Sequence, residues 1–394
     1  MDDRHGRLDV GGETSPPKLA YIDAVRGVAI LGVMAVHCSQ AIPASSTWLQ
    51  YAMLVGIRGV QLFYLASAIT LCMSWNRRSV RELCPTRNYF LRRFWRIAPL
   101  FYLAIGGYLL LDGWGPRTWA PNGVRSWFVP VTIMMAHGWH PETINGIVPG
   151  SWSIAVEFTF YLILPIILSV VTTPGRAVVL LAIAMALCVA NTWLMPQVWA
   201  PRYPDTQEYL VDAFTFFNFF SQLPVFAIGV STYFAIRDRS FRGVVASVVL
   251  GVCTSLASIW LRGAEFTIPN IVKNHVVFSA GLSAIVVFLS MYPSAVVVNS
   301  VTLFLGKLSY GLYLIHFATI HFLAKVFAAH VGDRGDIQSI AFFFLTACVS
   351  ALLAAVANRV VEEPGIALGK RIVAWGESRA TQRRAVYFVR AHLE

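Results

Sequence analysis

The chain has 394 residues, of which 57% are hydrophobic and only 13% are charged. A soluble domain carries about 25% charged residues, so this chain has too little polar surface to cover a soluble globule of its size. The composition excludes a soluble enzyme, a disordered regulator and a nucleic-acid binder with a basic face, and it leaves a polytopic membrane protein.

A helix that crosses a bilayer needs about 20 largely apolar residues. The sequence predicts an all-α bundle with an interior cavity and ten spans, at 22–42, 51–73, 89–111, 151–171, 177–195, 212–236, 243–261, 275–291, 302–328 and 338–358. We interpret 112–150 as a large loop, because its apolar segment 126–136 is too short to cross. Residues 1–18 are predicted as a cytoplasmic tail, 19–370 as the membrane domain and 371–394 as a basic cytoplasmic tail.

The positive charges predict the orientation of the bundle. With the amino terminus inside, the predicted cytoplasmic segments hold 23 Lys and Arg residues and the outer segments hold six. Cytoplasmic loops are enriched in these residues, so we expect both termini inside. These loops also account for the net charge of +11, so we expect no nucleic-acid partner. The first apolar run is too long for the core of a signal peptide and should remain as an anchor.

The first span carries Arg26 and His37, eleven residues apart. At about 100° and 1.5 Å per residue, both side chains project from one helix face with an axial separation of about 16 Å. A neutral imidazole near pH 7 can act as a general base. The alternative is structural: Arg26 reaches the membrane interface and His37 hydrogen-bonds a neighbouring helix.

The third span begins with a basic and aromatic segment that contains Arg92, Arg93 and Arg96. Arg93 and Arg96 are helical neighbours, and guanidinium groups suit bidentate contacts with phosphate. The alternative is an anchor that contacts anionic lipid headgroups.

The fourth span begins at Trp152 and Ser153 and places Glu157 inside the membrane. A buried carboxylate needs a partner, and we expect Arg58 of the second span to supply it. Such a pair could be purely structural, could orient a catalytic histidine or could bind a sugar hydroxyl.

The ninth span holds Tyr313 and His316, whose spacing allows both to line one cavity, although packing is the alternative for each alone. Glu362, Glu363 and Pro364 are interpreted as a capping turn that ends the last span. We find no metal-binding motif and expect no metal.

In their order along the chain, these segments resemble the acyltransferase-3 family of integral membrane O-acyltransferases. The resemblance covers about residues 19–370 and rests on six blocks: Arg26 to His37, Gly59 to Ser67, Arg93 with Arg96 before Pro99, Trp152 to Tyr161, Leu305 to His316, and Arg359 to Pro364. Two positions depart from the family pattern, because Gln61 stands where an Asp is usual and Ala68 follows Ser67 where Gly is frequent.

The resemblance implies transfer of an acyl group, usually acetyl, from cytoplasmic acyl-CoA to a hydroxyl of a glycan or glycolipid at the outer face of the plasma (inner) membrane. His37, Arg26 and Glu157 are then expected to be catalytic. The cluster Arg92, Arg93 and Arg96 would hold the phosphates of the coenzyme. The residues expected to bind the acceptor are Arg58, Trp152, Ser153, Tyr313 and His316.

Two alternatives remain open at the level of sequence. The acceptor could be a small molecule, such as a macrolide, or a lipid. The protein could also be a transporter of a lipid-linked saccharide, with the buried Arg, His and Glu residues as a proton relay. We see no internal inverted repeat of the kind that transporters use.

Overall fold

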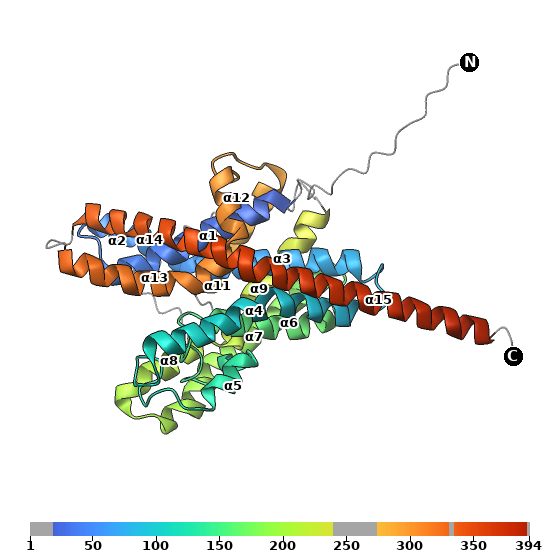
Figure 1. Ribbon diagram of the computed structural model, residues 1–394, viewed down its shortest axis with the longest axis horizontal. Helices are drawn as coiled ribbons and strands as arrows, with labels where there is room; N and C mark the ends of the chain where they lie inside the picture. Colours follow the sequence, from blue (N-terminus) through green and yellow to red (C-terminus); the bar gives the residue numbers. More distant parts are fainter. Residues whose placement is uncertain (1–18, 239–273, 331–334, 392–394) are drawn as a thin grey trace, which may run out of the picture.

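The computed structural model describes residues 19–238, 274–330 and 335–391. Within these ranges the chain forms helices and no named strand, which confirms the all-α prediction (Figure 1). The predicted tail 1–18 and the predicted span 243–261 lie outside the described residues. The α-helices are α1 (Ala20–Ala41), α2 (Thr47–Val55), α3 (Gly59–Arg78), α4 (Pro85–Asp112), α5 (Phe128–Ile133), α6 (Trp152–Val170), α7 (Pro174–Trp199), α8 (Glu208–Phe217), α9 (Phe219–Asp238), α11 (Asn274–Met291), α12 (Ser300–Lys307), α13 (Ser309–His330), α14 (Asp336–Ala357) and α15 (Glu363–Ala391).

In the described part of the chain, eight helices are long and apolar enough to cross a bilayer, and a ninth, shorter apolar helix runs over His275–Met291. Several predicted spans are broken into two helices. The span 302–328 divides into α12 and α13 at Leu308, and 212–236 divides into α8 and α9 at Asn218. The side chain of Asn218 accepts hydrogen bonds from the first backbone N–H groups of α9, so this residue starts a new helix.

The outward surface of the bundle is apolar, as a lipid-facing surface must be. Large hydrophobic side chains stand exposed along α7 and α14 (Val178, Val179, Ile183, Leu194, Phe344, Leu352, Leu353 and Val356). A soluble monomer rarely exposes so continuous an apolar surface. These two helices therefore present a surface suited to the hydrocarbon core of a bilayer.

Helix α1 lies at the centre of the bundle, in contact with α3, α12, α13 and α14. Small residues permit this close packing. A Cβ atom on Gly32 would meet the backbone of Gly56, and one on Gly56 would meet the backbone of Gly32. Small residues at such crossings let membrane helices approach closely. Because α1 is surrounded, its polar side chains face the interior.

The last span does not end where the sequence led us to expect. Helix α14 continues through a π-helical turn, Asn358–Glu362, into α15, so the predicted capping turn at Glu362, Glu363 and Pro364 is wrong. The wide turn accommodates Pro364, which lacks a backbone N–H and would clash with the preceding turn of a regular α-helix. Figure 1 shows α15 extending well past the bundle at the carboxyl end of the chain.

Helix α15 packs along α4 and caps the amino terminus of α4. The carboxylate of Glu377 accepts hydrogen bonds from the backbone N–H groups of Leu83 (2.8 Å) and Cys84 (3.0 Å), just before α4 begins. It also accepts a hydrogen bond from the side chain of Asn88 at 2.7 Å. A carboxylate at a helix amino terminus satisfies exposed N–H groups and interacts favourably with the helix dipole.

Candidate functional site

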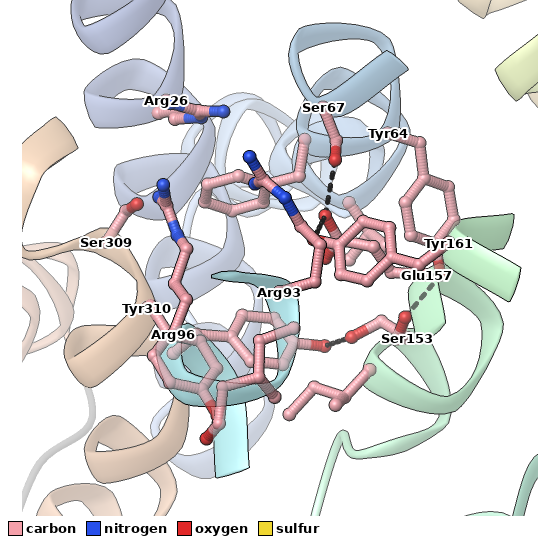
Figure 2. Close-up of a pocket in the computed structure, with 15 residues that line it drawn as sticks. Arg26, Tyr64, Ser67, Arg93, Arg96, Ser153, Glu157, Tyr161, Ser309 and Tyr310 are labelled. Carbon is pink, nitrogen blue, oxygen red and sulfur yellow. Dashed lines mark hydrogen bonds between the residues drawn. The ribbon is translucent and has the colours of Figure 1, made fainter. Parts of the chain in front are cut away.

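Five helices of the bundle line a cavity, which we call the arginine cavity (Figure 2). Its polar wall combines three arginines with one carboxylate and several hydroxyl groups. These polar residues are Arg26 from α1, Tyr64 and Ser67 from α3, Arg93 and Arg96 from α4, Ser153, Glu157 and Tyr161 from α6, and Ser309, Tyr310 and Tyr313 from α13.

Arg26 and Arg93 are held on this wall in different ways. Arg26, whose side chain is 16% exposed, donates to the Thr70 hydroxyl at 3.1 Å and reaches Asp23 at 3.5 Å. The guanidinium of Arg93 lies between the rings of Tyr89 and Tyr161, about 6 Å from each centroid. Within the described residues its buried Nε has no hydrogen-bond partner. Arg93 therefore keeps donor capacity for a ligand.

Glu157 faces the arginines and is held by two hydroxyl groups. Ser67 and Tyr161 each donate to its Oε1 at 2.5 Å. The expected partner Arg58 lines a different cavity, with its guanidinium 6.0 Å from the ring centroid of Phe278, so the predicted Arg58–Glu157 pair is wrong. The partner of a buried carboxylate depends on how helices pack in three dimensions, which span positions alone do not fix.

A second cavity, which we call the histidine cavity, lies around His37. Six aromatic rings line its wall, and its polar groups come from α1, the turn before α3, α3 itself, the loop before α6 and α13. Its polar and aromatic residues are His37, Gln40, Arg58, Gln61, Trp119, Asn145, Trp152, Phe216, Phe217, Tyr313 and Phe317.

The tautomer of His37 follows from its neighbour. Its Nδ1 lies 3.0 Å from Oε1 of Gln40. Because an amide oxygen can only accept, Nδ1 carries the proton and Nε2 keeps its lone pair. The ring also packs against Phe317, with a centroid distance of 4.4 Å. With Nδ1 bound to Gln40, Nε2 is the ring nitrogen of His37 that is left to act as a base.

Val60 and Tyr313 line both cavities. The Tyr313 hydroxyl donates to the Gly150 carbonyl at 2.9 Å and accepts from Ser153 Oγ at 2.8 Å. The arginine cavity and the histidine cavity are therefore neighbours that share a wall.

Two of the predicted site residues lie on neither wall. Arg92 donates two hydrogen bonds, of 2.8 and 3.0 Å, to the carboxylate of Glu82. His316 is fully buried behind His37, with ring centroids 5.4 Å apart, and its Nδ1 donates to the Leu312 carbonyl at 3.0 Å. Any role of His316 therefore passes through His37 rather than through direct contact with a ligand.

Sequence reasoning missed several wall residues. Gln40 stands three residues after His37 and Tyr161 four after Glu157, so helical spacing could have identified both. Trp119 lies in a loop and Phe217 at the end of α8, and no spacing in the sequence signals that both line the same cavity as His37.

The charges and donors of the two cavities set their chemistry. The arginine cavity carries three guanidinium groups against one carboxylate, so it attracts an anion with several oxygens. The histidine cavity offers a basic nitrogen beside aromatic faces and amide groups, which suits a hydroxyl-bearing ligand. Within the described ranges, no group of three or more His, Cys, Asp or Glu side chains comes together as in a metal site.

Comparison with known proteins gives distant but extensive similarities. The chain is 24% identical to Nodulation protein 10 of Rhizobium leguminosarum bv. viciae, over 84% of this chain and 88% of that protein. It is 25% identical to acyltransferase MdmB of Streptomyces mycarofaciens, over 80% of this chain and 84% of that protein. It is 22% identical to a protein of Staphylococcus aureus (strain COL) named as an O-acetyltransferase, over 93% of this chain but only 61% of that protein.

No solved structure matches the chain. A sequence model of the acyltransferase-3 family, described as an acyltransferase domain, matches residues 19–359. Because this match covers most of the chain, including the helices that line both cavities, the protein belongs to the acyltransferase-3 family and is a membrane acyltransferase of the O-acetyltransferase type.

Proposed function

We propose that the protein transfers an acetyl group from cytoplasmic acetyl-CoA to a hydroxyl of a glycan or glycolipid at the outer face of the plasma membrane. The observation that carries this proposal is the adjacency of two cavities with different chemistry, one rich in arginine and one containing His37, which share Val60 and Tyr313.

Arg26, Arg93 and Arg96 bind the phosphates of the coenzyme in this proposal. Guanidinium groups are matched to phosphate by charge and by their paired donors. We leave Arg92 out of the phosphate site, because Glu82 already occupies its guanidinium. The axial distance of about 16 Å between Arg26 and His37 is comparable to an extended pantetheine arm, so phosphates at the arginines leave the thioester near the imidazole.

His37 is the general base. Its Nε2 takes the proton of the acceptor hydroxyl while the hydroxyl oxygen attacks the thioester carbonyl carbon. The tetrahedral intermediate then expels the coenzyme sulfur, which takes up the proton from the imidazolium. General-base assistance of this kind typically accelerates a reaction about 10²–10⁴-fold. In a second route, His37 itself attacks the thioester carbonyl carbon and forms an acyl-histidine intermediate.

The walls of the histidine cavity support a sugar as the acceptor. Trp152 stacks on Phe217 with ring centroids 4.4 Å apart, and Trp119 lies beside them. Apolar ring faces suit the C–H faces of a sugar, while amide groups such as that of Asn145 can bind its hydroxyls.

Inside-out membrane vesicles from cells that express the chain test the donor and the base together, because they expose the cytoplasmic face and contain the acceptor that the cell supplies. With [¹⁴C]acetyl-CoA outside, wild-type vesicles should incorporate label into glycan or glycolipid, and right-side-out vesicles should not. His37→Gln should reduce incorporation about 10²-fold or more. His321→Gln is the matched control, since His321 is an exposed histidine of α13.

Three results would contradict the proposal: label entering both kinds of vesicle equally, His37→Gln retaining activity within a few-fold of wild type, or the saccharide crossing the membrane without acquiring label. Mass spectrometry of surface glycans from cells with and without the gene then identifies the acceptor. A mass shift of one acyl group on a glycan supports the glycan assignment, and a shift confined to a lipid or a small molecule overturns it.

A further inference from the structure

The wall shared by the two cavities is fixed on the side of Tyr313. Its hydroxyl makes two hydrogen bonds, one to Ser153 in the first turn of α6 and one to Gly150, two residues before α6 begins. Its ring packs edge-on against Phe63, with centroids 6.3 Å apart and an interplanar angle of 81°. A side chain held at its tip and along its face does not swing aside without losing these contacts.

The opposite side of the wall is fixed as well. Val60 is 8% exposed and, as a β-branched residue in a helix, has one strongly preferred rotamer. It follows Gly59, where an added Cβ would run into the carbonyl oxygen of Ala29 on α1. The start of α3 is therefore packed closely against α1, so the backbone that carries Val60 cannot shift towards α1.

We propose that Val60 and Tyr313 form a width filter that selects the acyl group delivered to His37. This inference rests on the proposed function, in which a thioester anchored by the arginines reaches the imidazole. Val60 and Tyr313 line both cavities. In this proposal a thioester that moves from the arginines to His37 passes these two side chains with the acyl group leading.

A passage between two stiff side chains discriminates by width rather than by length. A linear acyl chain is one methylene wide along its whole length. A branch at the carbon next to the carbonyl places two methyl groups side by side at the same depth. Excluding one such methyl group changes the specificity between the linear and the branched donor by about 10–200-fold. The filter therefore passes acetyl and linear acyl groups and rejects branched ones.

Butyryl-CoA and isobutyryl-CoA test this inference, because they have the same atoms and differ only in branching. Each is supplied with ¹⁴C in the acyl group to inside-out vesicles, with acetyl-CoA as reference. Wild type should prefer butyryl over isobutyryl by about 10-fold or more. Val60→Ala should lower that preference about 10-fold, because it removes two methyl groups from the passage.

Further variants at the same position keep the test decisive if Val60→Ala does not fold. Val60→Thr preserves the width and should keep the wild-type preference, whereas Val60→Ile narrows the passage and should lower butyryl transfer relative to acetyl. Val230→Ala is the matched control: it makes the same deletion at a buried valine of α9 that lines neither cavity.

The filter is refuted if wild type uses butyryl and isobutyryl equally. It is also refuted if the ratio is the same in Val60→Ala, Val60→Ile and wild type while acetyl transfer persists, or if Val230→Ala changes the ratio as much as Val60→Ala does. Absence of label from every donor in wild type is a different result, since it removes the proposed function itself.

Discussion

Arg93→Ala is expected to weaken binding of the coenzyme through its phosphates. The Arg93 guanidinium is held between Tyr89 and Tyr161 on the cavity wall, and within the described residues its Nε is unpaired. A hydrogen bond to a charged group contributes about 1.5–3 kcal/mol. Since about 1.4 kcal/mol corresponds to tenfold in affinity, the Kd of coenzyme A should rise about 10- to 150-fold.

The adjacent arginine provides the control. Arg92 donates to Glu82 and does not line the cavity. Because Arg92 makes no contact with the cavity, Arg92→Ala should change the Kd of coenzyme A by less than about 5-fold, which corresponds to about 1 kcal/mol. The two variants remove the same side chain from neighbouring positions and differ in which partner is lost.

Calorimetric titration of the purified protein in lipid nanodiscs measures both variants. Titrating coenzyme A and then pantetheine, which has the same arm without phosphates, separates a phosphate contact from a general loss of structure. Arg93→Ala should weaken coenzyme A and leave pantetheine within about 2-fold, since only the charged contact is removed. Equal losses for both ligands, or equal effects of Arg92→Ala and Arg93→Ala, would refute the reasoning.

Three further predictions concern the base, the helix packing and the loop before α6. Gln40→Leu removes the hydrogen-bond acceptor that holds the His37 ring; losing about 1 kcal/mol should lower kcat roughly 5- to 10-fold, while Gln40→Glu, which keeps an acceptor, should retain more activity. Gly369→Leu forces a side chain between α15 and α4 and should lower the free energy of unfolding by about 1–3 kcal/mol in denaturant titrations, whereas Gly106→Leu, with open space around it, should not. Burial lowers the pKa of His137 to about 4; the unfolded chain then binds more protons below about pH 6.5. Stability should therefore fall by roughly 2 kcal/mol between pH 7 and pH 5, and His137→Asn should remove this loss in thermal unfolding.

Sequence reasoning succeeded where a single helix fixes geometry. Arg26 and His37 both reach a cavity, because eleven residues of α1 return to the same face whatever the neighbouring helices do. It failed where the outcome depends on contacts between helices. Glu157 could have met any of several polar groups at its depth, and the packing of α3 against α6 brings Ser67 to it rather than Arg58.

The prediction missed the breaks inside the spans for another reason. A hydropathy window sums apolar content and does not register one residue that starts a new helix. Asn218 interrupts α8 and α9 through its own backbone-binding side chain, although the residues on both sides are apolar. The local chemistry of an asparagine in an apolar run would have been the signal to use.

Glu377 of α15 hydrogen-bonds the backbone just before α4, and this contact matters for the design of truncated versions of the protein. The family match stops at residue 359, which invites truncated versions that end there. Such a version would lose the acceptor for two backbone N–H groups at the beginning of the helix that carries Arg93 and Arg96. The end of the family match is therefore not the end of the unit that folds together. If a shortened protein bound the donor poorly, the cause would be fraying at the start of α4 and not the loss of a residue that contacts the donor.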